Sequence, residues 1–408
     1  MCSWPQPAFH ESERRARNSG EGPIRRLEVQ GIENETSVGA EGSAMKVLLI
    51  LAVGLLSLAN GANDNFKGVA TLWGAGLTTY RRAIAWATGF TFLGSLTAVW
   101  LGSALAAKFS GAKLVDSAVI SHLPFLTAIA LGAGATVLLA ARLGLPISTT
   151  HSITGALVGA GVTAAGFSHV RFAALGRGFI LPLLFSPIIA LVLTVGIQLV
   201  VTRLGWRAGG RNCICVDEPR TLAIAAINSS MPAAVTAPPL VRWAPVAECE
   251  TGAEIVRLNL ADGVHWFSGA AISFARGLND TPKIVAMLLV AAAASIKLDY
   301  FFVALVIAIG GALGAVRVAH TLGNKITPMA APEAVTANLV AAALVTLASP
   351  FALPVSTTHL TSGGIFGIGL LRRHEADWSK VRDILLSWLA TLPLGAVLAS
   401  IIYKLLQM

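Results

Sequence analysis

The heptapeptide Leu-Pro-Ile-Ser-Thr-Thr-His at residues 145–151 recurs almost unchanged as Leu-Pro-Val-Ser-Thr-Thr-His at residues 353–359. Each copy places a proline, three adjacent hydroxyl side chains and a histidine in apolar surroundings. Proline interrupts helices, and serine and threonine are common residues at helix N-termini. We therefore predict that one helical segment stops at each proline and that another begins at Ser148 and at Ser356.

Two interpretations of these hydroxyl triads are open from the residues alone. In the first, the side chains only cap helices. In the second, the hydroxyls and the unpaired backbone N–H groups of the helix start bind an anion of the phosphate or sulfate kind. The duplication favours the second, because paired interruptions in two halves of a membrane chain mark substrate sites. The predicted anion-site residues are Ser148, Thr149, Thr150, Ser356, Thr357 and Thr358.

The composition places these motifs in a membrane. The chain has 408 residues, of which 55% are hydrophobic and 12% are charged, and its mean hydropathy is +0.71. These values predict an all-α, multi-pass protein of the plasma or inner membrane, with the lipid bilayer as its surroundings. We attribute the net charge of +9 to lysines and arginines in cytoplasmic loops. Because no basic soluble module is visible, nucleic acid is not an expected partner.

The order of the apolar segments divides the chain into four parts. Residues 1–44 are polar and are predicted to be a disordered tail or the product of a wrongly assigned start codon. Residues 45–202 and 263–408 carry the motifs in the same order, which predicts two transmembrane repeats. Residues 203–262 between them are polar and are predicted to form a soluble linker with one or two short strands. Arginines directly after the preceding segment indicate that this linker is cytoplasmic.

A second motif, Gly-x-Asn-Asp-x-x-Lys, is also duplicated, at residues 61–67 and 277–283. An acidic side chain inside a membrane is costly and is by default functional. We predict that the helix is unwound at Asn279-Asp280 and restarts there, because Pro282 is tolerated in a first helical turn. In a simpler interpretation the aspartates only cap half-helices that face a water-filled vestibule, which does not exclude ligand binding.

Lys67 and Lys283 follow their aspartates by three residues and therefore lie on the same helix face. Each pair is predicted to be an internal ion pair, although a lysine that extends to the membrane interface is the alternative. The predicted residues for cation or proton coupling are Asn63, Asp64, Lys67, Asn279, Asp280 and Lys283.

Other polar residues carry weaker signals. His151 and His359 are interpreted as structural rather than as proton carriers. Three single-copy arginines are weaker candidates for anion attraction, and charges at loop ends are the more common interpretation; they are Arg142, Arg276 and Arg317. Cys213, Cys215 and Cys249 have a spacing that is poor for zinc, so neither a metal site nor a cofactor is predicted.

The four motifs together resemble those of the inorganic phosphate transporter (PiT) family, which also contains sulfate permeases. The resemblance covers residues 46–202 and 262–406. It implies two inverted repeats with broken or re-entrant helices that carry the paired motifs, a substrate site at their interface, and cation-coupled phosphate uptake. It also implies that the two hydroxyl triads line the phosphate site, and that the cation sites are lined by Asn63, Asp64, Asn279 and Asp280.

One departure from that family pattern makes this chain a divergent member. The family usually has asparagine three residues after the signature aspartate, where this chain has Lys67 and Lys283. An ammonium group has no acceptor atom, so it cannot coordinate sodium and would repel it. We therefore predict a secondary phosphate transporter that couples to protons rather than to sodium.

Two rival functions follow from the same residues. A permease for sulfate or another oxyanion would use the same hydroxyl triads. An intramembrane phosphatase would need a nucleophile with an adjacent base or metal ligands. The duplication gives no reason for two such catalytic sites, so the chain is predicted not to be an enzyme. Its oligomeric state is left open, a homo-oligomer included.

Overall fold

The protein is described here by a computed structural model that covers residues 40–204, 212–217, 221–224, 233–236, 241–245, 254–324, 327 and 329–408. Cys249 and residues 1–39 of the predicted tail lie outside these ranges. Helix α3 already begins at Ala40. Residues 40–44, predicted to belong to the tail, are therefore helical.

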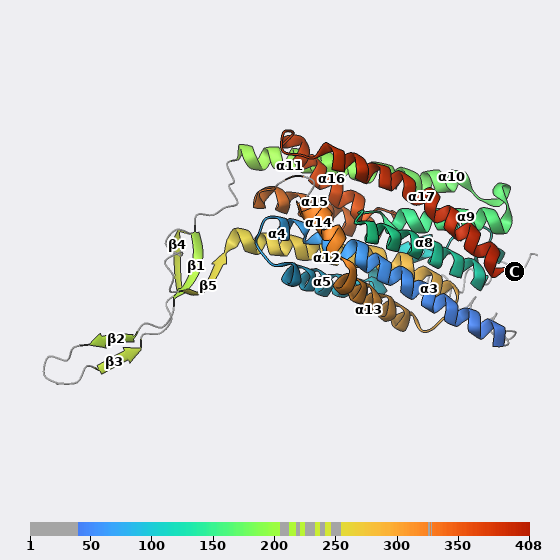
Figure 1. The fold of residues 1–408 in the computed structure, drawn as a ribbon, viewed down its shortest axis with the longest axis horizontal. Coiled ribbons are helices and arrows are strands. Elements are labelled where there is room, and N and C mark those ends of the chain that lie inside the picture. The colour runs from blue at the N-terminus through green and yellow to red at the C-terminus, as the bar shows by residue number, and fades with distance from the viewer. Residues whose placement is uncertain are drawn as a thin grey trace, which may run out of the picture.

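The described residues form a helical membrane protein (Figure 1). Within the described ranges, seven helical segments are long and apolar enough to cross a membrane. Each contains most or all of one long helix: α3 (Ala40–Asp64), α5 (Tyr80–Leu101), α8 (Leu123–Leu143), α11 (Leu181–Arg203), α13 (Ile296–Gly314), α15 (Ala331–Ala348) or α17 (Trp378–Leu406). The prediction of an all-α multi-pass membrane protein is confirmed.

Shorter elements connect these segments. Before the linker they are η2 (Asn65–Gly68), α4 (Ala70–Gly74), α6 (Ser103–Phe109), α7 (Ser117–Ile120), α9 (Thr149–Ala165), η3 (Phe167–His169), α10 (Phe172–Leu175) and η4 (Gly176–Ile180). After the linker they are α14 (Val316–Asn324) and α16 (Thr357–Leu371). The long helix α12 (Leu260–Val290) carries the second aspartate motif.

The helix starts predicted at the two hydroxyl triads are confirmed. Ser148 is the N-cap of α9, and its hydroxyl oxygen accepts a bond of 3.2 Å from the backbone N–H of His151. Ser356 caps α16 in the same way, with a bond of 3.2 Å from the backbone N–H of His359. Both helices therefore begin in the interior of the protein, because both serines are buried.

The two aspartate motifs differ in backbone structure. In the first motif α3 ends at Asp64 and a 3-10 turn follows, as an interrupted helix requires. In the second motif α12 runs without interruption through Asp280 and Pro282. The predicted unwinding at Asn279-Asp280 is therefore wrong. A proline removes one backbone hydrogen bond, but neighbouring helices can hold a membrane helix together across it, and α12 packs against both α5 and α15.

The linker contains more strands than the sequence predicts. Its strands β1 (Asn212–Asp217), β4 (Val241–Pro245) and β5 (Glu254–Asn259) form an antiparallel sheet in the order β4-β1-β5. A separate hairpin consists of β2 (Thr221–Ile224) and β3 (Ala233–Thr236). Figure 1 shows these strands at one end of the molecule. Strand β5 leads directly into α12 at Leu260, so the predicted boundary at residue 263 falls inside a helix.

Helices of the two halves are interleaved. Helices α3 and α9 of the first half pack on α13 and α17 of the second. Helices α12 and α16 of the second half pack on α5 and α11 of the first. Equivalent glycines make this possible. A Cβ atom on Gly61 would collide with the carbonyl oxygen of Ile307, and one on Gly277 with that of Thr91. The same close approach at the same motif position in both halves is what an internal duplication predicts.

The helical hairpins that carry the triads lie toward opposite ends of the molecule. Figure 1 shows α8 and α9 toward the C-terminal end of the chain, whereas α15 and α16 lie toward the end that bears the strands. This placement agrees with two repeats of opposite orientation, which stays a prediction.

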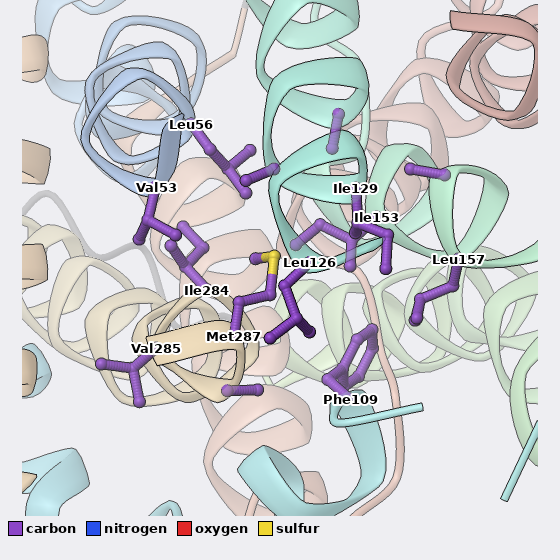
Figure 2. Packing of buried hydrophobic residues seen from close by; sticks show 14 of the residues in the cluster. Val53, Leu56, Phe109, Leu126, Ile129, Ile153, Leu157, Ile284, Val285 and Met287 are labelled. Carbon is purple, nitrogen blue, oxygen red and sulfur yellow. The ribbon is translucent and has the colours of Figure 1, made fainter. Parts of the chain in front are cut away.

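An apolar core lies between helices of the two halves. It joins side chains of α3, α6, α8, α9 and α12, drawn together in Figure 2. Val53 and Leu56 from the first half face Ile284 and Met287 from the second (Figure 2). Because both halves contribute, the position of the aspartate motifs relative to the triads is set by packing between the halves.

Candidate functional site

The four motifs meet in one buried cluster, although they are far apart in the sequence. The residues predicted for anion binding and for coupling are all at most 4% exposed. They come from the end of α3, the 3-10 turn after it, the middle of α12, and the starts of α9 and α16. The structure therefore brings together every site residue that the sequence predicts.

Lys67 is surrounded by oxygen atoms from both halves. Its ammonium group forms an ion pair with Asp64 and donates to Asn63 Oδ1 at 3.0 Å. It also donates to the carbonyl oxygen of Ile147 at 2.9 Å and to Thr358 Oγ1 at 2.5 Å. The predicted internal ion pair is present, and a lysine that extends to the membrane interface is not.

Lys283 has the equivalent surroundings. Its ammonium nitrogen lies 3.3 Å from Asp280 Oδ1 and donates to the carbonyl oxygen of Val355 and to Thr150 Oγ1, both at 2.8 Å. Val355 and Ile147 occupy the same position of the duplicated heptapeptide. Each lysine thus bonds to the last hydroxyl of the triad in the other half of the chain.

The three hydroxyls of each triad have different partners. The serine caps its helix, as described above. The middle threonine donates to the aspartate of its own half, Thr149 to Asp64 Oδ2 at 3.0 Å and Thr357 to Asp280 Oδ2 at 3.4 Å. The last threonine accepts from the lysine of the other half. The triads and the ion pairs therefore form one hydrogen-bonded network.

Arg276 belongs to this network, so its interpretation as a charge at a loop end is wrong. It is 2% exposed and lies on α12 one helical turn before Asp280. Its guanidinium donates to Asn60 Oδ1 at 2.8 Å and to Thr91 Oγ1 at 3.2 Å, and it also bonds to Asn65. Its Nε lies 3.8 Å from Asp280 Oδ2.

Asn60 is a second member that sequence reasoning missed. Its amide nitrogen donates to Asp64 Oδ2 and to Thr149 Oγ1, both at 3.0 Å, and lies 3.4 Å from Asp280 Oδ2. Asn60 directly precedes Gly61, as Arg276 directly precedes Gly277. Extending the comparison of the two motifs by one residue would have revealed this pair.

The two histidines that follow the triads also meet. The rings of His151 and His359 have centroids 4.5 Å apart, and His359 stacks on Trp388 at 3.9 Å. The indole nitrogen of Trp388 donates to the carbonyl oxygen of Pro146 at 3.0 Å. These contacts hold the starts of α9 and α16 against α17.

The network has more cationic than anionic groups. Lys67, Arg276 and Lys283 face the carboxylates of Asp64 and Asp280. The positive dipole ends of α9 and α16 add to this excess. Within the described part of the chain, no group of three or more histidine, cysteine, aspartate or glutamate residues is arranged to hold a metal ion. What this arrangement can accommodate is an additional negative charge.

A multi-pass helical fold around a buried, charged network defines a membrane transport protein. The model of the phosphate transporter family matches residues 60–399, so the chain belongs to that family. Because the family consists of transporters, the chain is not an enzyme, and the phosphatase alternative is excluded.

Individual relatives cover nearly the whole chain. A "Putative phosphate permease" of Pyrococcus abyssi is 29% identical, over 88% of this chain and 98% of that protein. A "Probable low-affinity inorganic phosphate transporter" of Bacillus subtilis is 26% identical, over 89% and 99%. A solved structure titled "The sodium-dependent phosphate transporter" has a TM-score of 0.70 and 19% identity, over 89% of this chain and 99% of that one. This last similarity supports the shared fold.

Proposed function

We propose that this protein transports inorganic phosphate and binds it between the starts of α9 and α16. The observation that carries the proposal is the excess of buried cations at two facing helix N-termini. Thr358 Oγ1 donates to the carbonyl oxygen of Ile147 at 2.8 Å, and Thr150 Oγ1 lies 3.4 Å from that of Val355. The two helix starts are therefore in contact, and an anion between them would meet both dipoles and both lysines. Relatives named as phosphate transporters support this substrate.

The coupling ion in this proposal is the proton. Lys67 occupies a cage of carboxylate, amide, carbonyl and hydroxyl oxygens, which are the ligand types that hard cations use. The equivalent position in the other half holds Lys283. The tethered ammonium group in each cage already occupies the oxygen atoms that sodium would need as ligands. It also supplies the positive charge that sodium would bring.

The network also provides a means of coupling. A proton on Asp64 would cancel the charge that holds Lys67 and would release the hydroxyl of Thr149, which donates to the same carboxylate. The freed ammonium and hydroxyl groups would then bind the anion. Asp280, Lys283 and Thr357 repeat this arrangement in the other half. Movement of one repeat against the other would expose the loaded site to alternate sides.

Uptake of labelled phosphate into proteoliposomes tests the substrate and the coupling ion together. We expect uptake to persist when choline replaces sodium and to increase with an inward proton gradient. Sulfate is the comparison anion: it stays a dianion at neutral pH and needs no protonation, so its uptake would depend differently on pH. A steep dependence on external sodium, with no response to a pH gradient, would refute proton coupling. Sulfate uptake that equals phosphate uptake would favour the oxyanion permease.

Substitution of the middle threonines tests the binding site. Thr149→Val and Thr357→Val should each weaken phosphate binding by about ten- to a hundredfold. The reason is that a lost hydrogen bond to a charged ligand is worth roughly 1.5–3 kcal/mol. Thr154→Val is the control, because the hydroxyl of Thr154 donates to the carbonyl oxygen of Thr150 within its own helix. If both test variants bind phosphate as the parent does, the triads only cap helices.

A further inference from the structure

A cavity of about 520 Å³ lies outside the buried network, where α8 and α13 end and α14 begins. Ala62 and Gly310 form part of its apolar wall, and its charged lining residues are Arg142 and Arg317. Both arginines are exposed, so the cavity opens at the protein surface. Its volume is sufficient for a hydrated oxyanion, since a water molecule takes about 30 Å³ in the liquid.

These two arginines lie together at the cavity without an acidic partner among the described residues. Arg317 donates to the carbonyl oxygen of Arg142 at 2.6 Å, which draws the two residues together. Among the described residues, neither guanidinium has a carboxylate within ion-pair distance, whereas Arg171 pairs with Asp116 at 3.5 Å. Two uncompensated guanidinium groups at one cavity attract anions, and their planar donors match phosphoryl oxygens.

The cavity adjoins the buried network. Ala62 in its wall precedes Asn63, whose amide nitrogen donates to the carbonyl oxygen of Leu145 at 2.9 Å. Leu145 belongs to the connection between α8 and α9, which starts directly after Arg142 and Leu143. Thr321 of α14 holds the same connection through a bond of 2.8 Å to the carbonyl oxygen of Gly144. The same connection carries Ile147, whose carbonyl oxygen accepts a bond of 2.9 Å from Lys67, so it contacts the buried network as well.

We propose that this cavity is an outer phosphate subsite, in which Arg142 and Arg317 collect the anion before it enters the buried network. The proposal rests on phosphate as the transported substrate. A charged cleft with apolar walls concentrates the field and raises the local concentration of a ligand of opposite charge. Loss of the two charges should therefore lower the rate of capture without changing the turnover of the inner site.

Initial rates of labelled phosphate uptake into vesicles test this subsite. At low ionic strength, the double variant Arg142→Gln plus Arg317→Gln should raise KM roughly tenfold, the lower end of what field focusing contributes to association. The kcat should stay at the parental value. Added salt should raise KM of the parent more than that of the variant, because it screens exposed charges. Lysine at both positions should return KM most of the way to the parental value, since capture depends on charge.

Two controls separate charge from structure. Thr321→Val removes a hydrogen bond to the same α8–α9 connection without a change of charge, and it should leave KM unchanged. Arg81→Gln plus Arg82→Gln removes the same charge from an exposed helix start elsewhere, and it should also have little effect. An unchanged KM in the test variant, or an equal rise in the Thr321 variant, would overturn the proposal.

The remaining alternative is a lipid headgroup in the cavity, which offers the same phosphoryl chemistry. Mass spectrometry of co-purified phospholipid distinguishes the two sources. Phospholipid that is lost from the glutamine variant, while KM for phosphate is unchanged, would assign the cavity to lipid. If the parent shows no phosphate uptake, the proposed function fails. Equilibrium binding of phosphate to the detergent-solubilised protein then tests the subsite by itself. The double glutamine variant should bind one phosphate fewer per protein molecule than the parent. Identical binding by parent and variant would overturn it.

Discussion

Asp64→Asn is expected to abolish phosphate accumulation, and Asp280→Asn is expected to do the same. Each substitution leaves a buried ammonium group without its carboxylate, which typically costs about 3–5 kcal/mol. It also removes the group that a coupling proton would occupy. The remaining network would have three cations against one carboxylate, so an anion that entered would be held rather than released. Accumulation is measured at matched expression of folded protein.

The controls distinguish a specific loss from a general failure to fold. Asp299 is a buried acid at the start of α13, outside the network, and Asp299→Asn should leave accumulation unchanged. The double variant Asp64→Asn plus Lys67→Met removes both charges and should recover stability without recovering proton-driven uptake. Parental accumulation in either single aspartate variant would show that a charge at that position is dispensable.

Replacing Lys67 and Lys283 together by asparagine should make uptake depend on sodium. The change removes both tethered ammonium groups and places an amide oxygen near the remaining ligands. For the first cage, these are Asp64, the carbonyl oxygen of Ile147 and the hydroxyl of Thr358. Uncompensated carboxylates in a low-dielectric site favour a bound cation. The measurement is the initial uptake rate as sodium is raised at constant ionic strength.

Methionine at both positions provides the matched comparison, because it removes the charges without adding a ligand oxygen. The methionine variant should lose uptake at all sodium concentrations. A folded asparagine variant that responds to sodium no more than the methionine variant does would contradict the idea that the ammonium groups stand in for ions.

The sequence by itself determined the features that depend on neighbouring residues. Ser148 caps a helix because a hydroxyl reaches the N–H three residues later, whatever surrounds it. Lys67 reaches Asp64 because residues three apart share a helix face. The apolar composition required membrane helices, and the duplication of both motifs indicated that the polar residues act as two related sets.

Other features were decided only in the tertiary structure. Whether α12 breaks at Asp280 depends on the helices that pack beside Pro282. The sequence around the motif does not specify which helices these are. The burial of Arg276 depends on α3 and α5, which bring Asn60 and Thr91 to its guanidinium. The bond from Lys67 to Thr358 joins the two halves across most of the chain. Such contacts arise from interleaved packing at glycines, and no local pattern of residues specifies which helix will lie there.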